Sequence, residues 1–531
     1  MKNMKKLVSV LLTLVMALAL TVPAFAATVT VPSDEILKDH TFTAFQVFSG
    51  REEGNVLSDV QWGDGINSSA FLADLQGEAT YGSLFTNCAT AADVAKVLSD
   101  NNTNTNTALA NRFAELAYAN KTGSGTALTS GENTLADGYY LIVDTTANVG
   151  EGGAYNKALL QVVGNISIAV KTDAPTVEKK VKEGGSYGDV ADCNIGDSVE
   201  FLLIGSVPDM SRYDTYKYIF HDTLSTGLTA PAEGNIQVYL SNDKVVDSSD
   251  TNVTSDFNIT VSGQNITVSC DNLKTVSGIS TDQYIIVKYS AVLNEKAEIG
   301  LDGNTNTVKL EYSNKPDQSG SGDTGNTGNT PEDKVIVFTY ELDTTKVDGQ
   351  DNTTKLKDAK FVLLNSEGTK VAKIVGGKFA GWQDLPNAGA DGKIAADAWT
   401  SESVLTSDEN GMFKVAGLDE GTYLLREIVA PTGYNMLTAD ITVVITATTS
   451  TTWNGENAST ALTKLEVTAG GKTTEGNTST GIVGITVENN KGATLPETGG
   501  IGTTIFYVLG AILVLGAGVL LVVKKRMGAD K

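Results

Sequence analysis

The sequence predicts a mainly β protein made of tandem β-sandwiches, the N-terminal one decorated with helices. Three observations support this fold class. Between residues 176 and 312 almost every apolar run alternates with period two and is bounded by turn residues, as in a β-sandwich. Residues 335–490 form a second strand-rich segment, whereas residues 28–170 mix strand-like runs with helical ones.

The first 26 residues have the three parts of a secretory signal peptide. They begin with lysines, continue with an apolar run over residues 7–22 and end in a small-x-small exit at Ala24-Phe25-Ala26. The run is short and stops at Pro23, which argues against a first transmembrane helix. We therefore expect residues 1–26 to be removed and the protein to be exported.

The first globular segment, assigned to residues 27–171, contains both strands and helices. Strand-like runs occur at 42–48, 139–143 and 159–163. Thr90-Ala-Ala-Asp93 has the pattern of a capping box and predicts a helix that follows it. Residues 109, 113 and 116 fall on one face of a further helix.

An internal repeat extends the sandwich prediction to this first segment. Asp137-Gly-Tyr-Tyr-Leu-Ile-Val-Asp144 parallels Glu420-Gly-Thr-Tyr-Leu-Leu-Arg-Glu427, with Gly, Tyr, Leu and an acid at matching positions. The repeat predicts an Ig-like sheet in both segments, with helices inserted in the first. Asp144 then occupies the position that Glu427 has in the later copy.

The remaining boundaries follow from composition. A second sandwich is assigned to residues 172–313. Residues 314–334 consist almost wholly of Gly, Ser, Thr, Asn, Asp, Gln and Pro, which predicts a flexible linker. A third domain is assigned to residues 335–491, with a long insertion around 384–407.

Composition excludes several functions. The chain has 39 basic and 63 acidic residues and a net charge of −24, which argues against binding nucleic acid or anionic lipid. It has two histidines and no HExxH or Gly-x-Ser-x-Gly motif, which argues against a secreted enzyme. We expect no cofactor and no metal site.

Three scattered cysteines give no disulfide framework, although a Cys193–Cys270 pair stays open.

The C-terminus combines three features in register. Leu495-Pro496-Glu497-Thr498-Gly499 precedes an uncharged run over 501–523, and a basic stub follows. The apolar run is long enough to span a bilayer. This order resembles the sorting signal of sortase substrates, assigned here to residues 495–531. The resemblance implies cleavage between Thr498 and Gly499, and covalent attachment through Thr498.

The third domain carries a reactive set of side chains. Strand alternation from residue 338 onward places Lys346 on the apolar face, and the same reasoning places Glu427 and Asn489 inward. Burial disfavours the charged forms of lysine and glutamate. A neutral Lys346 amine could attack the Asn489 side-chain amide and expel ammonia, with Glu427 as proton shuttle. Asn490 is the other candidate acceptor.

These residues also carry a resemblance. Thr345-Lys346-Val347-Asp348, the segment from Gly421 to Tyr434 and Val487-Glu-Asn489 resemble the collagen-adhesin B-type Ig-like domains of Gram-positive surface proteins, and the middle one resembles the "E box" of pilins. The resemblance implies an intramolecular isopeptide bond between Lys346 and Asn489, assisted by Glu427.

The second domain repeats the pattern. Alternation places Lys179 inward near its start and Asn306 inward near its end, and Asp222 lies at a strand end before a turn. The stretch resembles the isopeptide-forming middle domain of major pilins. This implies a bond between Lys179 and Asn306 assisted by Asp222, with Asn304 as the second candidate acceptor. The first domain lacks a lysine on its strand 41–48, so we predict no cross-link there.

Residues 165–175 resemble the pilin motif whose lysine receives the threonine carbonyl of the next subunit. The lysine would be Lys171, although Val170 stands where the motif usually has proline. Together these features resemble the backbone (major) subunit of a Gram-positive sortase-assembled pilus, secreted and anchored to the cell wall.

That resemblance defines the expected function and partners. The chain would be a structural, non-enzymatic subunit that forms its internal bonds by a single autocatalytic turnover and supports adhesion. Its partners would be other copies of itself, pilus-specific and housekeeping sortases and peptidoglycan, with ancillary pilins and a host surface as further candidates. The alternative is an adhesin or ancillary pilin anchored once to the wall and not polymerised.

Overall fold

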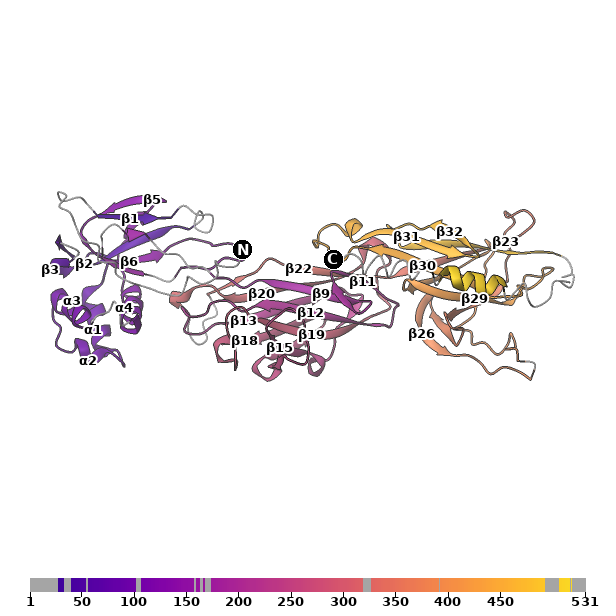
Figure 1. Ribbon diagram of the computed structural model, residues 1–531, viewed down its shortest axis with the longest axis horizontal. Coiled ribbons are helices and arrows are strands. Elements are labelled where there is room, and N and C mark those ends of the chain that lie inside the picture. The colour runs from indigo at the N-terminus through magenta and orange to yellow at the C-terminus, as the bar shows by residue number, and fades with distance from the viewer. Residues whose placement is uncertain are drawn as a thin grey trace.

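The computed structural model shows three β-rich bodies following one another along the long axis of the molecule (Figure 1). It describes residues 27–32, 40–53, 56–101, 107–156, 159–162, 166–167, 173–318, 326–390, 392–491, 506–515 and 517. The mainly β fold predicted from the sequence is confirmed, and apart from residues 506–515 the α-helices gather in the first body. The expected signal peptide, Lys171 and the pentapeptide 495–499 lie outside the described residues.

The first domain packs helices against a small sheet. Its strands are β1 (Ala27–Val31), β2 (Phe42–Glu53), β3 (Val56–Trp62), β4 (Thr126–Leu128), β5 (Gly131–Leu135), β6 (Gly138–Asp144), β7 (Leu159–Val162) and β8 (Ile166–Ser167). Its helices are α1 (Ser68–Gly77), α2 (Gly82–Phe85), α3 (Ala91–Asp100) and α4 (Thr107–Ala119). One sheet has the order β3-β2-β6-β7, with β4 pairing β2, and the other has the order β5-β1-β8.

Aromatic side chains join the helices to the larger sheet. Phe48 on β2 packs against Phe113 on α4, with ring centroids 6.2 Å apart, and Phe71 on α1 lies 5.0 Å from Phe113. The predicted capping box is present, because the Thr90 side chain accepts from the Asp93 amide and Asp93 accepts from the Thr90 amide. The helices therefore cover one face of the sheet, as Figure 1 shows.

The second domain is a sandwich of two sheets. Its strands are β9 (Val177–Glu183), β10 (Ser186–Gly188), β11 (Val190–Asp192), β12 (Ser198–Ser206), β13 (Tyr218–Leu224), β14 (Leu228–Thr229), β15 (Gln237–Ser241), β16 (Thr251–Asn252), β17 (Asn258–Ser262), β18 (Asn265–Cys270), β19 (Tyr284–Leu293), β20 (Asn304–Ser313), β21 (Thr327–Asn329) and β22 (Asp333–Phe338). One sheet has the order β10-β9-β12-β19-β15-β16 and the other β11-β22-β20-β13-β18-β17. β14 pairs β19, and β21 pairs β20. The inner faces enclose one apolar core.

The predicted boundary between linker and third domain needs correction. The sequence predicts a linker at 314–334 and a new domain from 335, but β21 and β22 both pair with β20 of the second domain. The reason is that β22 is buried on both faces. Val335 and Val337 face the core of the second domain, whereas Ile336 and Phe338 face the core of the third. This shared strand couples the two domains.

The third domain is one long sheet rolled around its own core. Its strands are β23 (Tyr340–Asp348), β24 (Lys360–Asn365), β25 (Lys370–Val375), β26 (Lys378–Asp384), β27 (Leu405–Thr406), β28 (Met412–Leu418), β29 (Gly421–Val429), β30 (Ile441–Thr449), β31 (Leu462–Ala469), β32 (Lys472–Glu475) and β33 (Ile482–Asn489). Their order is β32-β31-β30-β29-β24-β25-β26-β28-β23-β33, with β27 pairing β24. The first and last strands in sequence, β23 and β33, are parallel neighbours.

Short 3₁₀ turns complete the connections. They lie at Glu233–Asn235, Thr254–Asp256, Leu273–Thr275, Gly300–Asp302, Pro316–Gln318 and Ala458–Thr460. Residues 506–515 are helical. Within the described part of the chain, no helix has both the length and the apolar character needed to cross a bilayer. The three cysteines are buried and free, so the Cys193–Cys270 pair is not formed.

Candidate cross-linking sites

The candidate residues of the second domain come from both sheets of the sandwich. Lys179 lies on β9, and Asp222 and Asn306 lie on the facing sheet, on β13 and β20. In the antiparallel pair β13–β20, Asp222 is opposite Val308 and Leu224 is opposite Asn306. Asp222 and Asn306 are therefore diagonal neighbours on the inward face. The structure thus brings together three residues that are spread over the sequence from position 179 to position 306.

These three side chains share a dry, hydrogen-bonded cluster. Lys179 and Asn306 are 0% exposed and Asp222 is 1% exposed. The Lys179 Nζ donates to Asp222 Oδ1, and it lies 3.4 Å from the hydroxyl of Tyr289, a β19 residue. The Asn306 Nδ2 donates to the same hydroxyl over 2.7 Å. The Tyr289 hydroxyl in turn donates to Asp222 Oδ2.

Burial changes the proton balance of this cluster. Desolvation lowers the pKa of Lys179, and it outweighs the opposing attraction of Asp222 and Asp333. Desolvation, followed by the Asp222 charge, raises the pKa of Tyr289 well above its ordinary value. The site therefore favours an uncharged amine, which is a nucleophile, and a protonated phenol, which is a hydrogen-bond donor.

The alternative acceptor Asn304 is engaged elsewhere. Its Oδ1 accepts from the Glu298 amide over 3.1 Å, and its Nδ2 donates to the carbonyls of Glu298 and Val337, each over 3.1 Å. By contrast, Asn306 Oδ1 is buried without a hydrogen-bond partner among the described atoms. The arrangement favours Asn306 over Asn304 as the acceptor.

The third domain builds a comparable cluster within one rolled sheet. In the parallel pair β23–β33, Lys346 is in register with Val487 and Asp348 with Asn489. Glu427 lies on β29 and reaches the same interior. Lys346 is 0% exposed, Asn489 1% and Glu427 5%. The alternation that predicted all three as inward residues is therefore present in the structure.

Hydrogen bonds bring the acid to the acceptor amide. Asn489 Nδ2 donates to Glu427 Oε2 over 3.0 Å and to the Asn435 carbonyl over 2.6 Å. The Leu437 amide donates to the same glutamate oxygen over 2.8 Å. Lys346 Nζ donates to the Val487 carbonyl over 3.1 Å. In this interior, Glu427 Oε1 and Asn489 Oδ1 have no partner among the described atoms.

The protonation states again follow from burial. Desolvation lowers the pKa of Lys346 to about 8 against the attraction of Glu427 and Glu488. Desolvation also raises the pKa of Glu427, against its hydrogen bonds and the Lys346 charge. Glu427 is not paired with the adjacent Arg426, which makes two 2.8 Å hydrogen bonds to Asp440. Asn490, the alternative acceptor, is exposed.

The matching acid of the first domain has a different set of partners. Asp144 accepts from Thr146 Oγ1 over 2.6 Å and from the Asn156 amide over 2.9 Å, and it lies 2.7 Å from His40 Nδ1. Burial alone would raise the pKa of Asp144, but these hydrogen bonds outweigh it and lower the pKa. This carboxylate therefore has histidine, hydroxyl and amide partners and no lysine among them.

Two features escaped the sequence reasoning. Tyr289 has no sequence motif around it, although a buried tyrosine hydroxyl needs a partner and could have marked the site. A clamp of Asp348, Tyr434 and Lys491 was also missed. Asp348 Oδ2 accepts from Tyr434 OH over 2.9 Å and from Lys491 Nζ over 2.8 Å. The clamp fixes the end of the third domain beside Asn489.

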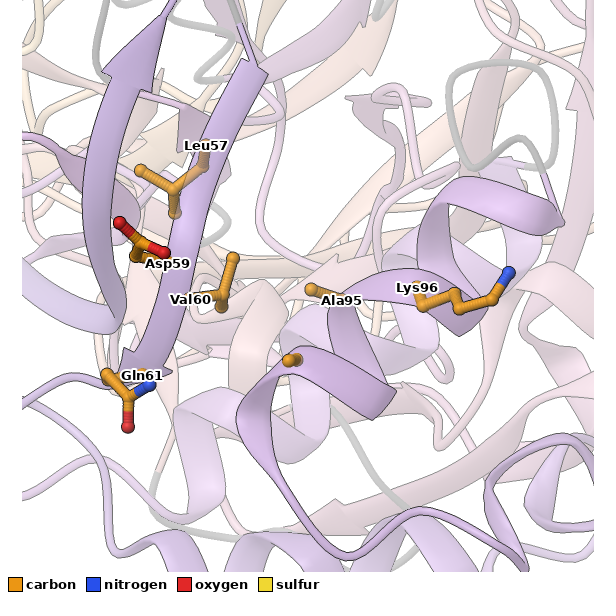
Figure 2. Close-up of a pocket in the computed structure, with 7 residues that line it drawn as sticks. Leu57, Asp59, Val60, Gln61, Ala95 and Lys96 are labelled. Atoms are coloured by element: carbon orange, nitrogen blue, oxygen red, sulfur yellow. The ribbon is translucent and has the colours of Figure 1, made fainter.

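Two surface hollows among the described residues are lined by none of the residues of these clusters. Figure 2 shows one of them between β3 and α3, where Leu57 and Val60 face Ala95 while Lys96 points away. Lys96 Nζ instead pairs with Asp100 at 2.6 Å. A second hollow lies beside Trp453 and Lys334, where the second and third domains meet. Among the described residues, no group of three or more His, Cys, Asp and Glu side chains could hold a metal ion.

Fold and motifs together define a cell-wall-anchored surface protein of tandem β-sandwiches. A family model described as the LPXTG cell wall anchor motif matches residues 487–527. A Gram-positive pilin backbone subunit 2, Cna-B-like domain matches residues 195–316, and a prealbumin-like fold domain matches residues 340–459. The chain is therefore a Gram-positive backbone pilin, as the resemblance predicted.

The chain is similar to known surface proteins and pilins. The trypsin-resistant surface T6 protein of Streptococcus pyogenes serotype M6 is 23% identical over 430 residues, which cover 68% of this chain and 71% of that protein. The solved T6 backbone pilin of this serotype, described as a modular three-domain structure, has a TM-score of 0.52 at 17% identity. That similarity covers 88% of this chain and all of the T6 chain, and it shows a shared fold. The major pilin SpaD of Corynebacterium diphtheriae has a TM-score of 0.47 at 14% identity, covering 88% and 98%.

Proposed function

We propose that this backbone pilin is polymerised head-to-tail by a sortase, and that each subunit is stiffened by two intramolecular isopeptide bonds. The observation that carries the proposal is the pair of buried lysine, acid and asparagine clusters, each with a low-pKa amine beside an acid and a carboxamide. Lys179 joins Asn306 with the help of Asp222, and Lys346 joins Asn489 with the help of Glu427.

The chemistry of each bond balances without a cofactor. The neutral lysine Nζ attacks Cγ of the asparagine, the Nζ–Cγ bond forms, and the Cγ–Nδ2 bond breaks. The acid moves protons from the attacking nitrogen toward the leaving one, and ammonia departs. Fixing the groups in one dry core supplies the proximity that makes this single turnover possible without an enzyme.

The bonds lie where they carry pulling force. In the third domain, tension that enters at Tyr340 on β23 and leaves after Asn489 on β33 passes through Lys346 and the bond. Residues 347–488 are then outside the load path. In the second domain, the Lys179–Asn306 bond removes residues 180–305 from the path in the same way. A subunit built like this resists extension even when its hydrogen bonds break.

Between subunits, the bond forms from Thr498 to Lys171. A sortase cleaves between Thr498 and Gly499, and the threonine carbonyl passes to the Lys171 amine of the neighbouring copy. The first domain then lies beside the loaded chain, because tension enters each subunit at Lys171. A housekeeping sortase finally transfers the polymer to peptidoglycan, and the fibre supports adhesion, with ancillary pilins and host surfaces as its partners.

The test is the size distribution of the surface protein. Cell-wall extracts boiled in detergent should show a ladder of covalent multimers for the wild-type chain and only monomer for Lys171→Ala. Lys180→Ala, which removes a lysine from the next strand, should leave the ladder intact. A single wild-type band would instead identify an adhesin or ancillary pilin that is anchored once.

A further inference from the structure

The hydroxyl of Tyr289 contacts all three other residues of the second-domain site. Tyr289 is 2% exposed, and its ring stacks on Phe201 at a centroid distance of 5.6 Å. Its hydroxyl accepts from Asn306 Nδ2 over 2.7 Å, donates to Asp222 Oδ2, and lies 3.4 Å from Lys179 Nζ. One phenol therefore touches the nucleophile, the acid and the nitrogen that must leave.

The two sites differ in how the acid reaches the leaving nitrogen. In the third domain, Glu427 Oε2 contacts Asn489 Nδ2 directly at 3.0 Å. In the second domain, the two oxygens of Asp222 contact Lys179 Nζ and Tyr289 OH. Among the described atoms, no hydrogen bond joins Asp222 to Asn306, and the tyrosine hydroxyl lies between them. The shorter aspartate thus reaches the amide through a tyrosine, where the longer glutamate needs none.

We propose that Tyr289 is a catalytic residue of the Lys179–Asn306 cross-link, passing a proton from Asp222 to the departing nitrogen of Asn306. This inference rests on the proposed function, because it concerns a step of that bond-forming reaction. It assigns the two domains different proton routes: carboxyl to amide in the third, and carboxyl to phenol to amide in the second.

The proton balance is complete. The count starts from the protonated amine. Lys179 gives one proton to Asp222 when it becomes the neutral nucleophile, before attack on Asn306 Cγ, and a second one from the tetrahedral intermediate. One of these protons stays on Asp222. Asp222 passes the other to Tyr289, which donates its own proton to Nδ2, so that the Cγ–Nδ2 bond breaks and ammonia leaves. Tyr289 ends as it began, and no oxidant or other reactant is needed.

The geometry also explains why the hydroxyl is suited to this role. Desolvation, followed by the Asp222 charge, keeps the phenol protonated, so it holds a proton until the amide nitrogen becomes a basic amine. The ring is fixed by Phe201, which lies opposite Tyr289 in the antiparallel pair β12–β19. A fixed donor within hydrogen-bond distance of the leaving atom meets the geometric requirement for general acid catalysis.

The test follows bond formation in newly made protein. The mature ectodomain, residues 27–498, is translated in a cell-free system, translation is stopped, and samples are quenched in acid at intervals. Intact mass counts ammonia losses of about 17 Da each, and peptide mapping assigns each loss to a domain. Tyr289→Phe should slow the second-domain loss by about 100-fold or more, the usual contribution of a general acid. The third-domain loss in the same molecules should keep its wild-type rate.

A matched control separates the relay from loss of a buried hydroxyl. Tyr218 lies in the same core, is 0% exposed, and donates to the Ser206 carbonyl over 2.9 Å without touching the site. Tyr218→Phe should therefore leave both rates unchanged. Should Tyr289→Phe disturb folding, difluorotyrosine at position 289 keeps the shape of the side chain and makes the phenol more acidic. It should change the second-domain rate severalfold.

The outcomes distinguish the two levels of the proposal. A wild-type second-domain rate in Tyr289→Phe, or no effect of difluorotyrosine, overturns the relay and leaves the cross-link standing. Equal slowing by Tyr218→Phe also overturns it, because the effect would then belong to the core as a whole. Absence of any second-domain loss in the wild-type protein overturns the cross-link and the relay together.

Discussion

Replacing Lys346 by methionine removes the attacking amine of the third domain while keeping most of the side-chain volume. The wild-type bond excludes residues 347–488 from the load path, and a chain extends by about 3.3–3.6 Å per residue. The variant should therefore release about 500 Å of additional length when the domain is pulled apart. This additional length follows directly from the positions of Lys346 and Asn489 in the sequence, because the bond between them closes the loop.

The assay is single-molecule force spectroscopy with handles at positions 171 and 498, where the proposed polymer is pulled. In the wild-type protein, the stretch 307–345 lies outside both closed loops and allows only about 130 Å of extension. Lys414→Met is the control, because Lys414 is a surface lysine of the same domain that pairs with Glu341 at 3.1 Å. A 500 Å step in the wild-type protein, or none in Lys346→Met, would refute the load-path reasoning.

Three further predictions concern stability and pH. Lys179→Met opens the loop from 179 to 306; by analogy with disulfides, closure of such a loop is worth about 5 kcal/mol. Calorimetry should therefore show the second-domain transition about 10–20 °C lower, whereas the solvent-facing Lys182→Met should shift it little. Because the pKa of Lys346 is lowered to about 8, the third-domain bond should form more slowly as pH falls from 8 to 6 in the quenched mass assay; a flat profile would contradict the neutral-amine mechanism. Burial, then Glu183 and Glu420, raise the pKa of Asp419 to about 7, so the folded state binds more protons than the unfolded state between about pH 4 and 7. Stability should therefore fall as pH rises through that window in urea unfolding, and Asp419→Asn should flatten this dependence; an unchanged slope in the variant would contradict the assignment.

Strand alternation predicted the inward residues because burial of a sandwich strand has period two. It correctly predicted that Lys179, Asn306 and Lys346 are buried. For Lys346 the alternation is counted from residue 338, and it holds although Thr339 separates β22 from β23. It also preferred Asn489 over Asn490, and Asn489 is the one of the two that the structure buries.

What the sequence did not predict depends on contacts between distant segments. Tyr289 looks like any aromatic core residue until Asp222 and Asn306 are placed across from it. The run from Val335 to Phe338 looked like the start of a domain, because nothing local shows that its two faces serve different cores. Packing of one sheet on the other decides the first case and pairing between strands decides the second, and the pattern of a single strand does not show which segments it will contact.

The central claim is that buried amines and carboxamides in this pilin react with one another. Intact-mass spectrometry of the mature ectodomain, residues 27–498, tests it most directly. We predict a mass about 34 Da below that of the unmodified chain, equal to two ammonia losses, with one loss restored by Lys179→Ala and the other by Lys346→Ala. A wild-type ectodomain at its full unmodified mass would contradict the account.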